Sequence, residues 1–188
     1  MTQRRILVFA ASNSRTSINR KLALHAGEVL CSVFEDAFEL FSIDLNDFEM
    51  PIYSPERQAN GGIPALAQRF YDHISAADGV IISFAEHNGS YAVAYKNVFD
   101  WCSRIDMKVY QDKPVLLLAT SPGARGGQLV LDTAYEVLPY FGGQIVGKFK
   151  LPSFGENFDN DANAISEPHI AAELRRSVHA LGSAILLD

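Results

Sequence analysis

Hydroxyl, amide and guanidinium side chains are concentrated in one short stretch near the start of the chain. They include Ser12, Ser14, Arg15, Thr16, Ser17 and Asn19. The stretch follows the apolar run 6–9 and precedes a helical pattern, so it stands where a strand passes into a helix. The first turn of a helix has unpaired backbone N–H groups and a partial positive charge, and both favour a bound anion. Ser17 alone could cap this helix, but capping needs no cation, and Arg15 therefore favours a phosphate site.

Apolar runs and their spacing predict the elements that position this stretch. Short apolar runs bounded by turn residues indicate strands, and apolar residues at helical spacing indicate helices. Five strands are predicted, at 4–11, 38–45, 80–84, 115–120 and 144–151. Helices are predicted over 18–34, from 64 to 77, around 94–105, up to 137 and over 170–185. Prolines and glycines interrupt 46–62 and acidic residues fill 152–166, so both stretches are predicted to be loops.

Strands that alternate with helices predict an α/β fold with a parallel sheet and helices on both of its faces. Strand order 2-1-3-4-5 would place strands one, three and four side by side. Polar loops follow these three strands, at 12–19, 86–91 and 121–127. Ligands of such sheets bind beyond the carboxyl ends of the strands, so one ligand could touch all three loops.

The composition of the three loops narrows the choice of ligand. The first loop lacks the glycine pattern of a dinucleotide fingerprint and the Gly-Lys-Ser/Thr ending of a P-loop, which favours a monophosphate over a nucleoside triphosphate. The second and third loops are rich in Gly, Asn, Ser and Pro, and a glycine-containing backbone can approach a flat polar edge closely. FMN has one phosphate, a ribityl chain and a ring with a polar rim, and it matches the three loops in order.

Three motifs resemble those of the NAD(P)H-dependent FMN reductase family, and the resemblance covers residue 4 to roughly residue 150. The first is the Ser-x-x-Arg-x-Ser-x-Asn pattern from Ser12 to Asn19, which in that family holds the FMN phosphate. The second is similar to the family's Pro-Glu-Tyr-Asn-Gly-Ser loop and the Lys-Asn-x-x-Asp-Trp helix after it. The third, 121–127, is similar to the family's loop along the isoalloxazine ring.

The resemblance implies a flavodoxin-like three-layer sandwich and an oxidoreductase. Hydride would pass from NAD(P)H to bound FMN and then, in a ping-pong cycle, to a quinone, free flavin or similar small-molecule acceptor. The chain would form a homodimer or homotetramer. No catalytic side chain is assigned, because the cofactor performs the chemistry. The residues implied to bind the cofactor are Ser12, Ser14, Arg15, Ser17, Ile18, Asn19, Glu86, His87, Asn88, Gly89, Ser90, Ser121, Pro122 and Gly123.

Two residues of the second loop depart from the family pattern. Ala85 and His87 stand where the family has proline and tyrosine, which changes the expected environment of the flavin ring but not the backbone contacts.

Two alternative functions stay open. One is a flavodoxin-type electron carrier without pyridine-nucleotide turnover, although Arg15 and the missing Thr/Ser-x-Thr-Gly-x-Thr pattern disfavour it. The other is an interaction or regulatory protein that keeps the fold without the cofactor.

Length and composition set the remaining expectations. With 188 residues, 48% of them apolar, the chain is expected to form one domain over 1–188. A formal charge of −6 without a long basic run disfavours a nucleic-acid partner. The apolar runs are shorter than the roughly 18 residues of a membrane span, so neither a span nor a signal peptide is expected. Cys31 and Cys102 are far apart and suggest reduced thiols in a cytoplasmic protein, and no histidine or cysteine spacing indicates a metal.

Overall fold

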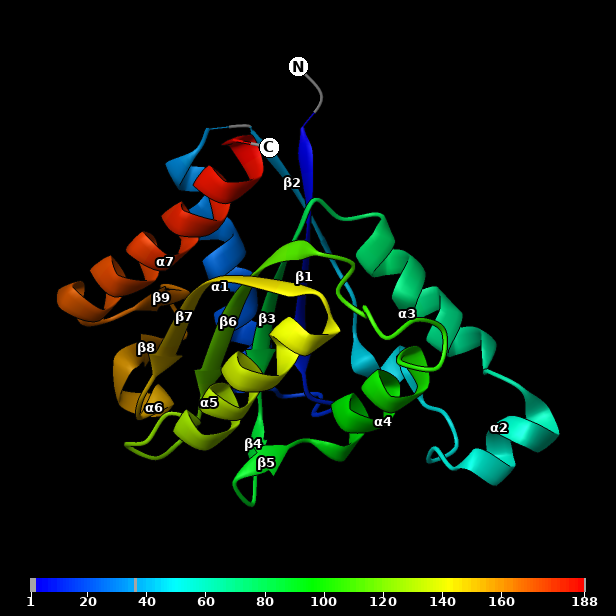
Figure 1. Cartoon of the computed structure of the whole chain (residues 1–188). Helices are drawn as coiled ribbons and strands as arrows, with labels where there is room; N and C mark the ends of the chain where they lie inside the picture. Colours follow the sequence, from blue (N-terminus) through cyan, green and yellow to red (C-terminus); the bar gives the residue numbers. More distant parts are fainter. Residues whose placement is uncertain (1–2, 36, 188) are drawn as a thin grey trace.

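The computed structural model describes residues 3–35 and 37–187, and its centre is a sheet of five parallel strands (Figure 1). The strands are β1 (Arg4–Ala11), β2 (Phe38–Ser42), β3 (Gly79–Phe84), β6 (Lys113–Thr120) and β7 (Gly143–Leu151). Their order is β2-β1-β3-β6-β7, and each neighbouring pair is parallel. This order confirms the predicted 2-1-3-4-5. Strands β1, β3 and β6 are buried on both faces, which is why their sequences are continuous apolar runs.

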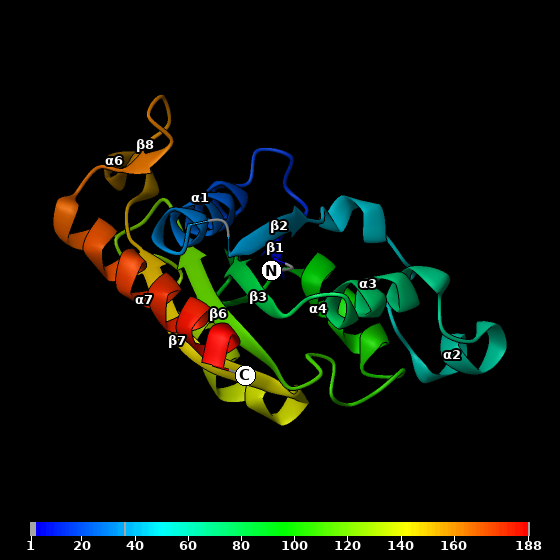
Figure 2. The same ribbon diagram turned by 90° about the horizontal axis from the view of Figure 1, so that it is seen from above.

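Helices cover both faces of the sheet, and the view from above separates the layers (Figure 2). One face carries α1 (Ile18–Val33) and α7 (Pro168–Leu187). The other carries α3 (Ala65–Ser75), α4 (Val93–Cys102) and α5 (Gln128–Val137), with the 3-10 turn η2 (Leu138–Phe141) after α5. The predicted three-layer architecture is therefore confirmed. Within the described ranges, no helix combines the length and the apolar character needed to cross a membrane.

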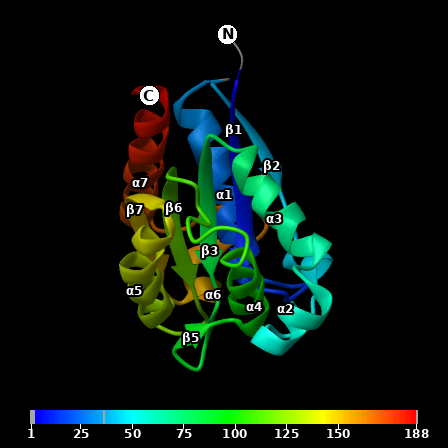
Figure 3. The ribbon, with the colours of Figure 1, turned by 45° about the vertical axis from the view of Figure 1, so that its right-hand side comes forward.

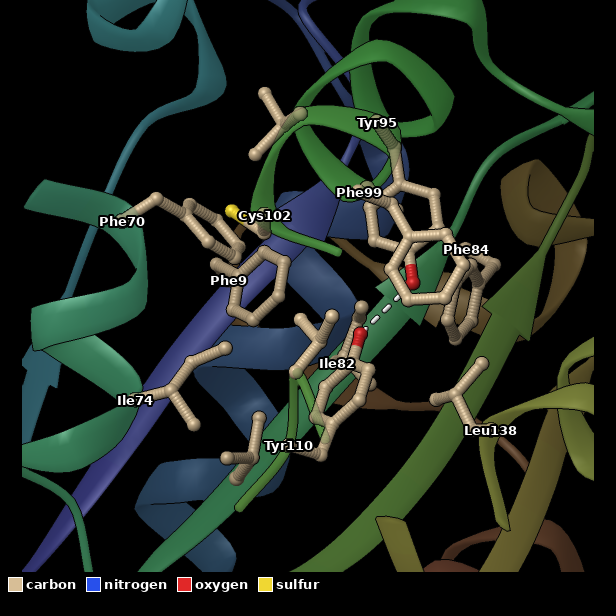
Figure 4. Close-up of a cluster of buried hydrophobic side chains, with 14 of the residues drawn as sticks. Phe9, Phe70, Ile74, Ile82, Phe84, Tyr95, Phe99, Cys102, Tyr110 and Leu138 are labelled. Carbon is tan, nitrogen blue, oxygen red and sulfur yellow. Dashed lines mark hydrogen bonds between the residues drawn. The ribbon is translucent and has the colours of Figure 1, made fainter. Parts of the chain in front are cut away.

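Alternation along each strand sends side chains into two separate cores. On β3, Ile81 packs with the α1 and α7 side, whereas Ile82 packs with the α3, α4 and α5 side. The second core is rich in aromatic rings, as Figure 4 shows for Phe9, Phe70, Phe84, Tyr95, Phe99 and Tyr110. The hydroxyls of Tyr95 and Tyr110 lie 2.8 Å apart and bond each other, so neither buried polar group is left without a partner (Figure 4).

The prediction that 46–62 is a loop is wrong. The 3-10 turn η1 (Leu45–Phe48) reaches into this stretch, and the helix α2 (Pro55–Gly61) follows near the same end of the molecule as α4 and β5 (Figure 3). The Ser54 hydroxyl caps α2 by accepting a hydrogen bond from Arg57 N at 3.2 Å, and Pro55 occupies the first helical position. Gly62 ends α2 with φ at 73°. The residues that indicated a loop are thus the start and stop signals of a short helix.

Two further predictions need correction. The second strand ends at Ser42 rather than at residue 45, because Asp44 accepts a hydrogen bond from Asn46 N at 2.9 Å and so starts η1. The predicted loop 152–166 contains α6 (Phe154–Asn157), β8 (Phe158–Asp159) and β9 (Ala164–Ile165). Its few apolar residues are the anchors: Phe154 and Phe158 stack at 4.7 Å between ring centroids and are buried in the core beside α1 and α7.

Candidate functional site

The three polar loops lie together at the carboxyl end of the sheet (Figure 1). Residues 12–17 follow β1, and the hairpin of β4 (Glu86–His87) and β5 (Ser90–Tyr91) follows β3. Residues 121–127 follow β6. Because β3 lies between β1 and β6 in the sheet, the hairpin starts between the other two loops.

The first loop presents unpaired backbone donors at the start of α1. The backbone N–H groups of Arg15, Thr16, Ile18 and Asn19 donate no hydrogen bond to any described residue. The Ser17 hydroxyl caps α1 by accepting from Arg20 N at 3.2 Å, which leaves its own hydrogen free to donate. Unpaired donors at the positive end of a 16-residue helix make this turn suitable for an anion.

Arg15 supplies a cation beside these donors. Its side chain is exposed and pairs with no carboxylate in the described ranges. The nearby Asp44 is held instead by Arg20, whose Nη1 lies 3.1 Å from Asp44 Oδ2. The pKa of Asp44 is lowered, chiefly by the hydrogen bond from Asn46 N and further by the charges of Arg20 and Arg15. Arg15 therefore lies within the field of this acid but remains available for another anion.

The second loop is a tight hairpin, which the sequence analysis did not predict. Its turn residues Asn88 and Gly89 have φ of 52° and 77°, and a type I′ turn requires positive φ at both positions. The dipeptide Asn-Gly is the sequence signal for such a hairpin. Glu86 ties the hairpin to the start of α5, because its Oε2 accepts a hydrogen bond from Val130 N at 3.1 Å.

The third loop is held against the segment after β7. The carbonyl of Gly123 accepts a hydrogen bond from Ser153 N at 3.0 Å. Gly127, the last residue before α5, has φ at 76°. A Cβ at this position would lie 3.0 Å from the Cβ of Ala119 in β6. Glycine is needed there both for the left-handed backbone and for the close approach to the sheet.

A cavity of about 290 Å³ lies between the three loops. The predicted site residues that line it are Ser12, Ser14, Ser17, Ile18, Asn19, Glu86, His87, Ser121 and Pro122. The predicted residues outside its lining are Arg15, Asn88, Gly89, Ser90 and Gly123. Ala85 and Thr120 also line the cavity although the sequence analysis did not assign them to the site. Thr16 lines it too, and the sequence analysis named it in the polar stretch but not among the cofactor-binding residues. A polar residue at the end of an apolar strand, as in Thr120, is a signal that could have identified one of them.

A second cavity, of about 320 Å³, shares His87 with the first. Its apolar lining comes from two regions of the chain, with Leu45, Phe48, Met50 and Ile52 from one and Ala92, Val93 and Ala94 from the other. Helix α4 holds the segment 45–52 through hydrogen bonds to its backbone. Asn97 Nδ2 donates to Met50 O at 3.0 Å, and Trp101 Nε1 donates to Pro51 O at 2.8 Å.

Known sequences resemble this chain over much of its length. A sequence model of the family described as NADPH-dependent FMN reductase matches residues 4–156. A quinone reductase of Escherichia coli is 31% identical over 121 residues, which are 59% of this chain and 64% of that protein. A 2-hydroxy-1,4-benzoquinone reductase of a Burkholderia species is 34% identical over 123 residues, which are 65% of this chain and 63% of that protein. Both alignments span less than two thirds of the relative's length.

Solved structures match over almost the whole chain. The flavoenzyme NAD(P)H:(acceptor) oxidoreductase FerB of Paracoccus denitrificans has a TM-score of 0.74 at 25% identity, with 98% of each chain covered. An oxidoreductase of Corynebacterium diphtheriae has a TM-score of 0.72 at 22% identity, covering 99% of this chain and 98% of that one. The second likeness shows the fold alone, which is the flavodoxin-like fold expected from the sequence.

Proposed function

Because the chain belongs to the NADPH-dependent FMN reductase family, we propose that it takes a hydride from NAD(P)H onto bound FMN and passes it to a small acceptor. One observation carries this proposal. The unpaired backbone N–H groups of Arg15 and Thr16 in the first loop and of Ile18 and Asn19 in α1 lie beside a cavity whose lining includes Ser12, Ser14, Thr16 and Ser17. The exposed cation of Arg15 adds to this donor set, which suits a single phosphate group.

The chemistry of the cavity fits the phosphate of FMN. A phosphate monoester carries roughly −1.5 to −2 charge at neutral pH and three strong acceptor oxygens. We assign the Ser14, Thr16 and Ser17 hydroxyls and the N–H groups of Ile18 and Asn19 as donors to it. Among the described lining residues the only acid is Glu86, and its Oε2 is already engaged by the N–H of Val130.

The second and third loops would hold the flavin ring through backbone groups of 86–90 and 121–123. The bound FMN would supply the hydride and electron-transfer chemistry. The chain would bind and orient it, and backbone N–H groups near the ring would stabilise its negative charge. His87 lines both cavities, so we assign it to the boundary between the cofactor and the second substrate.

The second cavity supports a quinone or free flavin as the acceptor. Its lining combines apolar side chains with Asn13, Asn46 and Asn97, whose amides could bond the carbonyl groups of a planar ring, and it also includes Glu49. We also propose a homodimer or homotetramer in the cytoplasm. In support of association, Ile52 and Val93 beside this cavity are 64% and 70% exposed in the single chain.

The visible spectrum of protein purified with added FMN tests the proposal. We expect flavin absorption that stays with the protein, bleaches when NADPH or NADH is added without oxygen, and returns when a quinone is added. A bound flavin that bleaches only with dithionite would support the electron carrier and overturn the reductase proposal. Protein that cannot be loaded with FMN would contradict both.

Arg15→Gln tests the phosphate assignment separately. A hydrogen bond to a charged group contributes about 1.5–3 kcal/mol, so the dissociation constant for FMN should rise by roughly 10- to 150-fold. Arg175→Gln is the matched control, because Arg175 is an exposed arginine in α7, outside the three loops. Equal FMN affinity in the two variants would refute the role of Arg15.

A further inference from the structure

A buried hydrogen-bond network centred on Asn19 lies beneath the three loops. Asn19, Ser83 and Thr120 are 3%, 0% and 1% exposed. Asn19 Oδ1 accepts two hydrogen bonds, from Ser83 Oγ at 2.7 Å and from Thr120 N at 3.0 Å. Asn19 Nδ2 donates to Thr120 O at 3.1 Å, and Thr120 Oγ1 donates to Leu151 O at 2.7 Å. The amide of Asn19 is thus bonded through both its oxygen and its nitrogen.

The network joins the points from which the cofactor loops depart. Asn19 is the second residue of α1, directly after the first loop. Ser83 belongs to β3 and precedes the hairpin that starts at Glu86. Thr120 is the last residue of β6, directly before the third loop. One side chain therefore links all three loops, and a shift of one loop relative to the others would break at least one bond.

This arrangement changes the role expected for Asn19. The sequence analysis placed its side chain among the phosphate donors, yet one amide hydrogen is used by Thr120 O and the oxygen faces two internal donors. Only the second amide hydrogen and the backbone N–H are left for a ligand, since neither has a partner in the described ranges. Most of the side chain's bonding capacity is directed at the protein.

We propose that Asn19 is a positioning residue, which holds the phosphate loop, the hairpin and the third loop at the mutual spacing that one FMN molecule requires. This inference rests on the proposed function. The buried bonds of Asn19 favour one arrangement of the groups that they join, because any other arrangement leaves a buried donor or acceptor of Ser83 or Thr120 unpaired. The network reaches β7 through Leu151, so the fourth strand end is held in the same frame.

Ser83→Ala tests this proposal, because Ser83 is fully buried and is not among the residues that line the cavity. Its effect on FMN must therefore pass through Asn19. Loss of one hydrogen bond from the network should raise the FMN dissociation constant by roughly 5- to 10-fold. The visible circular dichroism of the FMN-saturated variant should also change, because this signal depends on the surroundings of the flavin ring. At saturation it does not depend on the dissociation constant for FMN.

Val178→Ala is the control for a purely structural effect. Val178 is fully buried in α7, away from the three loops, so its truncation lowers stability without touching the network. We expect Val178→Ala to bind FMN within twofold of the wild type and to keep the wild-type dichroism. Asn19→Asp keeps the size and the acceptor oxygen but loses the donor to Thr120 O, and it should weaken FMN binding more than Ser83→Ala does.

The outcomes separate this inference from the proposed function. If the wild type binds FMN and Ser83→Ala has the affinity and dichroism of Val178→Ala, Asn19 has a structural role only and the inference is overturned. If the wild type does not bind FMN, the proposed function fails, and the inference fails with it.

Discussion

Replacing Gly127 with alanine tests how closely the third loop is held over the sheet. Gly127 has φ 76° and ψ 30°, and an alanine in this left-handed conformation costs about 1–2 kcal/mol. The added Cβ would lie 3.0 Å from the Cβ of Ala119, a fully buried residue in the sheet. Since neither atom sits on a flexible side chain, this overpacking adds roughly 1–3 kcal/mol. We therefore expect Gly127→Ala to lower the free energy of unfolding by about 2–5 kcal/mol.

Urea unfolding of the cofactor-free protein, followed by far-ultraviolet circular dichroism, measures this loss. With a slope of about 2 kcal/mol per molar urea, the midpoint should fall by roughly 1–2.5 M. Gly61→Ala is the matched control, because Gly61 lies in α2 and an added Cβ there meets nothing within 4 Å. Its midpoint should stay level or rise, since alanine favours a helix by up to about 1 kcal/mol. If Gly127→Ala unfolds at the wild-type midpoint, both the backbone cost and the close approach are refuted.

Three other changes test the packing around the site. The buried hydroxyl of Tyr91 bonds no described residue, so Tyr91→Phe should leave the urea midpoint level or raise the free energy of unfolding by up to about 1 kcal/mol; a clear fall would contradict this. Burial raises the pKa of Cys102 from 9.0 to about 12 and that of Tyr91 from 10.0 to about 12, so the fold favours the protonated forms. The stability that these two groups contribute is complete below about pH 9 and is lost as the pH rises through about 12. Cys102→Ala removes the group with the ordinary pKa of 9.0 and leaves Tyr91, so the urea midpoint should begin to fall near pH 10 instead of pH 9. Trp101→Phe removes the 2.8 Å bond to Pro51 O, so it should cost about 1–3 kcal/mol and speed protease cleavage within 49–61, whereas unchanged cleavage would show that this bond does not anchor the segment.

The central strands and the polar loop before α1 were predictable from the local composition of the sequence. Strands buried on both faces are continuous apolar runs, and β1, β3 and β6 are of this kind. The donors at the start of α1 follow equally from a polar stretch between a strand and a helix. Two further elements also had local signals. Ser54 and Pro55 start the short helix α2 and Gly62 ends it, and Asn88-Gly89 forms the turn of the hairpin β4–β5. The sequence analysis interpreted these residues only as loop formers.

By itself the sequence determined the α/β architecture and the three polar loops, because apolar periodicity and turn chemistry are properties of neighbouring residues. Only the tertiary structure decided what each polar side chain bonds. Asn19 is engaged by Ser83 and Thr120, which are 64 and 101 residues away, and Glu86 by the N–H of Val130, 44 residues away. The reason is physical: a buried polar group must find a partner, and its partners are set by which strand ends the fold brings side by side.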